Sequence, residues 1–344
     1  MYFHVPTVDI TPYVTGGTAE ERAAVAAAID KACTEVGFIQ IIGHGVPASA
    51  IDGLKSAMDE FFALELEAKK QYRVPTNRGY SPPKSESLSL SLGVEAATRM
   101  NDFFEAFNIG NAASEFPGLD LPDADYSENV WPTEVPTFER ATTAYFAEAS
   151  RVALTMREIF ADALGLAPGF FAQYTDHSLN VMRMNNYALP PGTVELDGEL
   201  TGMGEHTDYG IVTILWADQV RGLQVLGTDG SWNDVSPADD ALLINLGDVT
   251  GRWTNERWMS TLHRVKPPIV GGTIERRRSA AFFLDGNIDA LIETLPVTID
   301  DEHPNLYTPV TVGEHLRAKL AGSRAGVRNE AAEREGARVL SAQG

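Results

Sequence analysis

Two residues in the second half of the chain, His206 and Asp208, have side chains that can bind one metal ion together. On an extended backbone, positions i and i+2 face the same side. His263, in a strand-like stretch far downstream, could supply a third ligand. Two histidines and one carboxylate occupy one face of an octahedron and leave three positions open, which is typical of non-haem iron(II) sites that bind O₂ beside a co-substrate. The pattern therefore predicts that these three residues hold iron(II) and form the catalytic centre.

A second group of polar residues could bind an organic acid beside such a metal. Arg277 and Ser279 are two positions apart, so a guanidinium and a hydroxyl would share one face of a strand. Together they can hold a carboxylate by a bidentate ion pair and one further hydrogen bond. Asn185 and Tyr187 could add polar contacts to the same ligand. Alternatively, Arg277 could be one of three consecutive surface arginines, residues 276–278. Composition alone does not decide between a carboxylate-binding role and this surface position.

The composition of the chain restricts the classes of function. The 344 residues carry a formal net charge of −21 at pH 7, which makes nucleic acid and anionic membranes poor partners. Cys33 is the single cysteine, and its amphipathic context favours a buried, inert thiol. No signal peptide is visible, and no segment approaches the ~20 apolar residues of a membrane span. We expect a cytoplasmic enzyme that acts on a small molecule, as a monomer or a homodimer.

The elements that must position these residues change in character near residue 176. Before it, helices are predicted over residues 18–36, 48–66 and 137–164, and the first begins with a capping box formed by Thr18 and Glu21. Strands are predicted over residues 37–42 and 102–110. The stretch 78–92, rich in serine and containing Gly and Pro, is predicted to be a loop.

After residue 176, short alternating segments recur about every ten residues and are separated by Gly, Asp, Asn and Pro. Strands are predicted over residues 180–187, 210–216, 222–226, 241–245 and 279–284. Many short, regularly spaced strands indicate a closed or double-sheet architecture such as a jelly roll. Residues 245–248 are predicted to form a tight turn with a structural role, and His44 to lie in a turn without a catalytic role. A final helix is expected after residue 311.

Short motifs follow one another in a distinctive order from Val5 to about Leu320. They are Gly37-Phe38 through His44-Gly45-Val46-Pro47, Arg78-Gly79-Tyr80, residues 182–187, residues 204–210, Gly222-Leu223-Gln224-Val225, Asn245-Leu246-Gly247-Asp248, Arg252-Trp253-Thr254-Asn255, residues 260–265, Arg277-x-Ser279 and Phe282-Phe283-Leu284-Asp285. Through this set the chain resembles the isopenicillin N synthase-like branch of the iron(II)/2-oxoglutarate-dependent oxygenases. The resemblance implies a mainly β fold with flanking α-helices, a cupin-like double-stranded β-helix (jelly roll).

The resemblance also implies a role for each position that matches a family motif. These roles are iron ligation by His206, Asp208 and His263, binding of the 2-oxoglutarate co-substrate by Arg277, Ser279, Asn185 and Tyr187, and contact with the organic substrate by Phe283 and Asp285. Phe283 could equally be a core residue. The iron would use O₂ and 2-oxoglutarate together.

The implied function is that of an oxidoreductase, a dioxygenase of the kind found in secondary metabolism. It would oxidise a C–H bond of a small organic molecule by hydroxylation, desaturation or ring closure, with release of succinate and CO₂. One alternative is an iron(II) oxidase or oxidative cyclase of the isopenicillin N synthase type, which keeps the Arg-x-Ser pair but does not use 2-oxoglutarate. A non-catalytic jelly-roll binding protein would be expected to lose a ligand or Arg277, and a zinc hydrolase leaves the Arg-x-Ser strand without a role.

We expect one oxygenase domain over residues 1–320. Within it, residues 1–175 would form a helix-rich part and residues 176–300 the jelly-roll core that carries the iron site. Residues 321–344 would be a charged helix or tail. The loops 81–98 and 110–132, with this tail, are expected to shape the substrate pocket.

Overall fold

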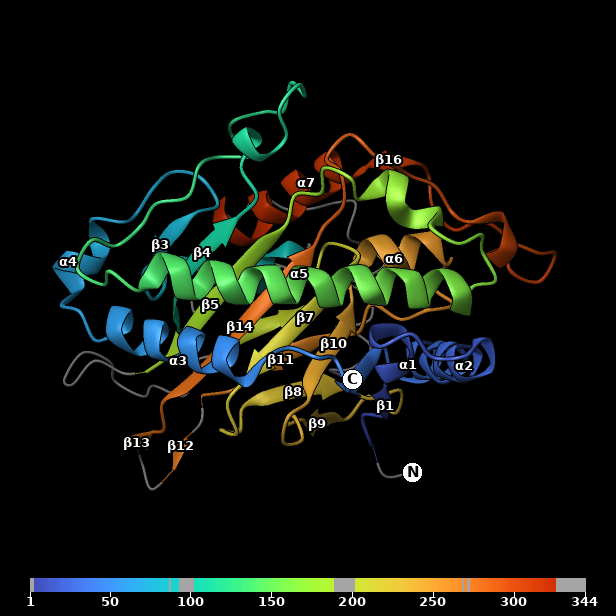
Figure 1. Ribbon diagram of the computed structural model, residues 1–344, viewed down its shortest axis with the longest axis horizontal. Coiled ribbons are helices and arrows are strands. Elements are labelled where there is room, and N and C mark those ends of the chain that lie inside the picture. Colours follow the sequence, from blue (N-terminus) through green and yellow to red (C-terminus); the bar gives the residue numbers. More distant parts are fainter. Residues whose placement is uncertain are drawn as a thin grey trace.

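The fold is built around one large β-sheet, which lies behind a long helix in Figure 1. The computed structural model describes residues 3–86, 88–92, 102–188, 202–267, 269–270 and 273–325. In spatial order, the eight strands of the large sheet are β1 (Thr7–Asp9), β2 (Phe38–Ile42), β10 (Leu242–Leu246), β7 (Val212–Ala217), β14 (Arg277–Leu284), β5 (Val181–Tyr187), β4 (Glu105–Gly110) and β3 (Gly79–Ser81).

A second sheet lies across a cavity that residues of both sheets line. Its strands are β6 (Met203–His206), β11 (His263–Val265), β8 (Leu223–Leu226) and β9 (Trp232–Asp234). The described strands also form two small two-stranded sheets. One pairs β12 (Ile269–Val270) with β13 (Thr273–Ile274), and the other pairs β15 (Leu291–Ile292) with β16 (Val310–Thr311). The two main sheets form the jelly roll that the strand pattern predicts.

Helices pack around this β structure. They are α1 (Thr11–Val14), α2 (Ala19–Glu35), α3 (Ala48–Phe62), α4 (Leu66–Lys70), α5 (Phe138–Ala163), α6 (Asp248–Trp253) and α7 (Val312–Ala325), with the 3₁₀ segments η1 (Leu88–Leu92), η2 (Ala113–Glu115), η3 (Phe170–Tyr174) and η4 (Pro296–Thr298). The long helix α5 contacts β7 and β14, and α2 and α3 pack beside it (Figure 1). Its buried residues, such as Tyr145, Ala149 and Val152, recur at helical spacing, so one apolar face covers the sheet.

The start of α2 follows directly from its sequence. The backbone N–H of Glu21 donates to Thr18 Oγ1 at 3.2 Å, and the backbone N–H of Thr18 donates to Glu21 Oε2 at 2.8 Å. The predicted capping box is therefore confirmed. Cys33 lies on the buried side of this helix as a free thiol, which confirms the prediction of a buried cysteine.

Three local predictions are wrong in part. The helix predicted over 48–66 ends at Phe62, where the chain turns and Lys69 Nζ donates to the Phe62 carbonyl at 3.1 Å. The predicted loop 78–92 contains β3, because this short strand gains its partner, β4, only in the folded sheet. Residues 245–248 do not form a separate tight turn, since β10 continues to Leu246 and α6 begins at Asp248.

Strands from the first part of the chain extend the large sheet at both edges. β1 and β2 lie at one edge and β4 and β3 at the other, so residues before 176 contribute to the sheet as well as to the helices. Residues 321–325 of the predicted tail belong to α7, whereas residues 326–344 lie outside the described part of the chain. Among the described helices, none has the length and hydropathy that crossing a membrane requires.

Candidate active site

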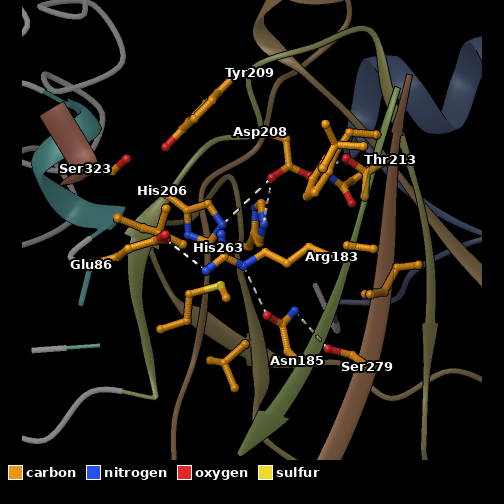
Figure 2. A pocket seen from close by; sticks show the side chains of 18 of the residues that line it. Glu86, Arg183, Asn185, His206, Asp208, Tyr209, Thr213, His263, Ser279 and Ser323 are labelled. Carbon is orange, nitrogen blue, oxygen red and sulfur yellow. Dashed lines mark hydrogen bonds and ion pairs between the residues drawn. The ribbon is translucent and has the colours of Figure 1, made fainter. Parts of the chain in front are cut away.

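The register of two short strands brings the predicted histidine ligands together. His206, the last residue of β6, is directly opposite His263, the first residue of β11, and their ring centroids are 4.2 Å apart. Asp208 Oδ1 lies 3.8 Å from His206 Nε2 and 3.7 Å from His263 Nε2. All three side chains are buried, and Figure 2 shows them converging on one point. The structure therefore unites the three residues that the sequence predicts as a metal site.

Backbone carbonyl groups orient both imidazole rings. His206 Nδ1 lies 2.8 Å from the Gly204 carbonyl, and His263 Nδ1 lies 3.1 Å from the Thr261 carbonyl. Because a carbonyl oxygen only accepts, each Nδ1 carries the proton and each Nε2 presents a lone pair to the centre. Burial, reinforced by the neighbouring His263, holds the pKa of His206 well below its ordinary value, so this ring is neutral.

The third predicted ligand, Asp208, is held through one of its two carboxylate oxygens. Oδ2 accepts hydrogen bonds from Thr213 Oγ1 and from Asn245 Nδ2, the latter at 2.6 Å. Thr213 and Asn245 are directly opposite each other in the pairing of β7 with β10, so both reach the same oxygen. Oδ1 is then the atom that faces the two histidines.

Asn245 is a site residue that the sequence interpretation missed by assigning residues 245–248 to a structural turn. Its side-chain amide donates directly to the carboxylate of Asp208. The sequence did contain a sign of this role, because Asn245 is the one polar residue in the apolar, buried strand β10. A polar residue in such a strand needs a hydrogen-bond partner.

The geometry fits one iron(II) ion. One potential ligand atom from each of His206, Asp208 and His263 lies within 4.8 Å of the other two. Two neutral imidazoles and one carboxylate leave room for co-substrate and O₂ on an octahedral metal. The free lone pairs on Nε2 and Oδ1 all point to the same centre.

The neighbouring wall of the cavity contains the residues predicted to bind a carboxylate. In the pairing of β14 with β5, Arg277 is opposite Tyr187 and Ser279 is opposite Asn185. Ser279 Oγ accepts hydrogen bonds from Arg277 Nη1 and Asn185 Nδ2, each at 3.4 Å, and the Arg277 guanidinium lies 5.2 Å from the centre of the Tyr187 ring. The four predicted residues therefore form one cluster.

Arg277 is not part of a surface run. Its side chain is 2% exposed, whereas Arg276 and Arg278 point elsewhere and form ion pairs with Asp59. Within the described part of the chain, Arg277 has no acidic partner. A buried guanidinium without a counter-ion is unfavourable unless an anion binds to it. This site therefore fits a carboxylate ligand.

These residues line a cavity of about 130 Å³. Phe283 belongs to its wall and is partly buried. Asp285 lines it too, and burial, followed by the charge of Asp208, raises the pKa of Asp285 to about 8. Among the described residues of the predicted loop 110–132, none lines the cavity, so that expectation is wrong.

Instead, α7 supplies part of the cavity wall, including Leu316, Leu320 and Arg324. Arg324 lies beside two other charged side chains that the sequence interpretation did not include, the buried Glu86 and the partly buried Arg183. Arg183 could have been found from its position on β5, two residues before Asn185 and on the same face of that strand.

Comparisons with known proteins agree with this geometry. The family model of the 2OG-Fe(II) oxygenase superfamily matches residues 179–286, and the model described as non-haem dioxygenase in morphine synthesis N-terminal matches residues 5–134. The first region contains all the predicted site residues from Asn185 to Asp285.

Whole proteins and a solved structure are similar to almost the full length of the chain. A 2-oxoglutarate-dependent dioxygenase of Penicillium crustosum is 32% identical over 87% of this chain and 89% of its own. Validamycin A dioxygenase of Streptomyces hygroscopicus subsp. limoneus is 33% identical over 92% of this chain and 85% of its own. The crystal structure of Neurospora crassa T7H in complex with alpha-KG and thymine superposes with a TM-score of 0.79 at 25% identity, covering 92% of this chain and 96% of that one.

Proposed function

Because the chain belongs to the iron(II)/2-oxoglutarate-dependent oxygenase family, we propose that His206, Asp208 and His263 bind its catalytic iron. The enzyme is a dioxygenase that oxidises a small organic molecule with O₂ and converts 2-oxoglutarate to succinate and CO₂. The observation that carries the assignment of residues is the convergence of Nε2 of both histidines and Oδ1 of Asp208 on one point.

The second part of the proposal concerns 2-oxoglutarate. Arg277 and Ser279 bind its distal carboxylate, and Asn185 and Tyr187 complete that subsite. The buried guanidinium of Arg277, which has no acidic partner among the described residues, supports this role. The Tyr187 ring beneath it supports the guanidinium by a cation–π contact.

Each group then has a defined task in the reaction. Bound iron(II) supplies the redox chemistry by which O₂ oxidises a C–H bond. Thr213 and Asn245 fix the Asp208 carboxylate, and the carbonyls behind the histidines keep the Nε2 lone pairs directed at the metal. Phe283 and Asp285 contact the organic substrate, a role that their position in the cavity wall supports.

A wider set of properties belongs to the same proposal. The enzyme acts in the cytoplasm, as a monomer or a homodimer, in secondary metabolism, and it has no nucleic-acid or membrane partner. The net charge of −21 supports the last point, because it disfavours binding to phosphate-rich surfaces. Residues 1–320 act as one oxygenase domain, a division supported by the large sheet, whose strands come from Thr7 to Leu284.

Anaerobic addition of iron(II) and 2-oxoglutarate tests the site directly. The protein is expected to develop a weak visible charge-transfer band, and to form succinate when O₂ is admitted. His206→Ala should abolish both signals. His303→Ala is the control, because His303 is exposed and its imidazole pairs with Asp300 at the surface. A band that survives in H206A, or O₂ uptake without succinate, would contradict the proposal.

A further inference from the structure

Three charged side chains from distant parts of the chain meet in the cavity wall. Glu86 lies between β3 and η1, Arg183 on β5 and Arg324 in the last turn of α7. Arg183 Nη2 donates to Glu86 Oε2 at 2.8 Å, and Arg324 Nε lies 3.4 Å from Glu86 Oε1. Figure 2 shows Arg183 between Glu86 and Asn185. Each carboxylate oxygen of Glu86 thus faces one guanidinium.

This cluster carries one excess positive charge. Burial opposes ionisation of Glu86, but Arg183 and Arg324 outweigh burial and lower the pKa of its carboxyl. One carboxylate therefore faces two guanidinium groups. The other partners of the arginines are neutral amides, since Arg183 Nε donates to Asn185 Oδ1 at 3.2 Å and Arg324 Nη2 donates to Asn77 Oδ1 at 2.5 Å.

Among the residues that the structure describes, the other charged side chains of the cavity wall do not supply an anion for this cluster. In the loaded enzyme, the charges of iron(II), Asp208, Arg277 and doubly charged 2-oxoglutarate cancel. Asp285, the other acidic residue of the described wall, does not supply it either, because burial raises the pKa of its carboxyl to about 8 and leaves it largely uncharged near neutral pH. The side chains of Glu86 and Arg183 are 6% and 11% exposed and that of Arg324 is 29% exposed, so water solvates the excess charge only in part, and an anionic ligand would stabilise it. Among the components of the reaction, the organic substrate can supply this negative charge.

We propose, on the basis of the function proposed above, that Arg183 and Arg324 bind a carboxylate group of the organic substrate. Glu86 positions the two guanidinium groups, one at each of its carboxylate oxygens. Guanidinium groups suit this task because their planar N–H donors match the geometry of a carboxylate. Helix α7 thereby becomes a specificity element, since Arg324 comes from its last turn.

A purely structural reading of the same contacts makes a different prediction. The cluster could have a purely structural role, in which Glu86 links α7 to β5. Removal of Glu86 or of Arg324 would then have the same effect on every substrate. If Arg324 binds the substrate, its loss should remove the preference for acids, whereas Glu86→Gln should keep that preference even where its overall rate falls.

The test uses the full chain loaded with iron(II) and 2-oxoglutarate. The probes are phenylacetate, cinnamate and octanoate, each compared with the amide and the amine of the same skeleton. Succinate formation above the rate without probe, and oxidised products by mass spectrometry, are measured. We expect stimulation by at least one acid and not by its amide or amine. In Arg324→Met, the KM for that acid should rise about tenfold or more, as loss of a charged hydrogen bond implies.

Arg317→Met provides a matched control on the same helix. Arg317 is exposed and pairs with Asp125 at the surface, away from the cavity wall, so this variant should retain the acid preference. The charge-transfer band of every variant is recorded first, which separates damage to the iron site from loss of substrate binding.

The outcomes that would overturn the inference are equally specific. An amide or amine that stimulates as well as its acid, or an unchanged KM in R324M, would do so. Stimulation by none of the acids, in an enzyme that still shows the band and forms succinate, would overturn this inference alone. Equal loss of the preference for acids in E86Q and R324M would favour a purely structural role for the cluster. Absence of both band and succinate would overturn the proposed function and this inference with it.

Discussion

Lys319 Nζ lies 2.8 Å from Asp248 Oδ2, and the side chains of both residues are 1% exposed. This buried ion pair joins α7 to the start of α6. It also lies directly behind the metal site, because Lys319 donates to Thr207 Oγ1 at 3.3 Å and the backbone N–H of Asp248 donates to the Asp208 carbonyl at 2.9 Å. Although burial opposes ionisation of Asp248, Lys319 and His315 lower the pKa of its carboxyl.

Lys319→Met should therefore destabilise the protein strongly. It leaves the Asp248 carboxylate buried without its cation, which costs about 3–5 kcal/mol in comparable cases. The free energy of unfolding, measured by urea denaturation, checks this value. Lys55→Met is the control, since Lys55 forms an exposed pair with Asp52 and should cost no more than about 1 kcal/mol. A K319M protein as stable as the unmodified chain would contradict the prediction.

Asn245→Ala should weaken iron binding without removing a ligand. The variant deprives Asp208 Oδ2 of one of its two donors, so the carboxylate is less firmly oriented. Loss of such a supporting contact lowers metal affinity by about 10–100-fold. Titration of iron(II) in the presence of 2-oxoglutarate, followed by the charge-transfer band, measures the change. Asn233→Ala removes a surface amide that bonds only to Ser231, and it should leave the titration unchanged.

Arg277→Met should impair the use of 2-oxoglutarate. The variant removes the charged hydrogen bonds proposed for the distal carboxylate, so the KM for 2-oxoglutarate should rise about tenfold or more. Steady-state succinate formation measures it. Arg276→Met tests whether any neighbouring arginine has this effect, because Arg276 is exposed and pairs with Asp59 of α3. Equal KM values for the two variants would argue against the assigned role of Arg277.

The stability that Glu86 provides should depend on pH in a defined direction. Arg183 and Arg324 hold its pKa below the ordinary value of 4.5 against the effect of burial. A carboxyl group with a lowered pKa in the folded state stabilises the fold above its unfolded-state pKa and loses this contribution as the pH falls through the folded-state pKa. The difference in unfolding free energy between the unmodified chain and Glu86→Gln should thus be largest near neutral pH and shrink below pH 4.5.

Urea denaturation across this pH range checks the prediction. Glu67→Gln serves as the control, because Glu67 is exposed and pairs with Lys70 on the surface of α4. Its effect should be small throughout the range. A difference for E86Q that grows as the pH falls would show that the carboxylate does not stabilise the fold in its ionised form.

The sequence predicted the parts of the site that depend on local periodicity. His206 with Asp208, and Arg277 with Ser279, are each two residues apart, and the period of an extended chain places each pair on one face. The alternation of short apolar segments likewise predicted most strands of the jelly roll, and the capping box at Thr18 predicted the start of α2. These features involve residues that are near neighbours along the chain.

The tertiary structure alone decided the contacts between distant residues. Strand register brought Asn245 opposite Thr213 so that both hold Asp208, and this changed a predicted turn into part of the site. The packing of α7 likewise placed Lys319 behind the ligands and Arg324 beside Glu86. Register and helix packing result from the burial of the whole core, so no local pattern in the sequence determines them.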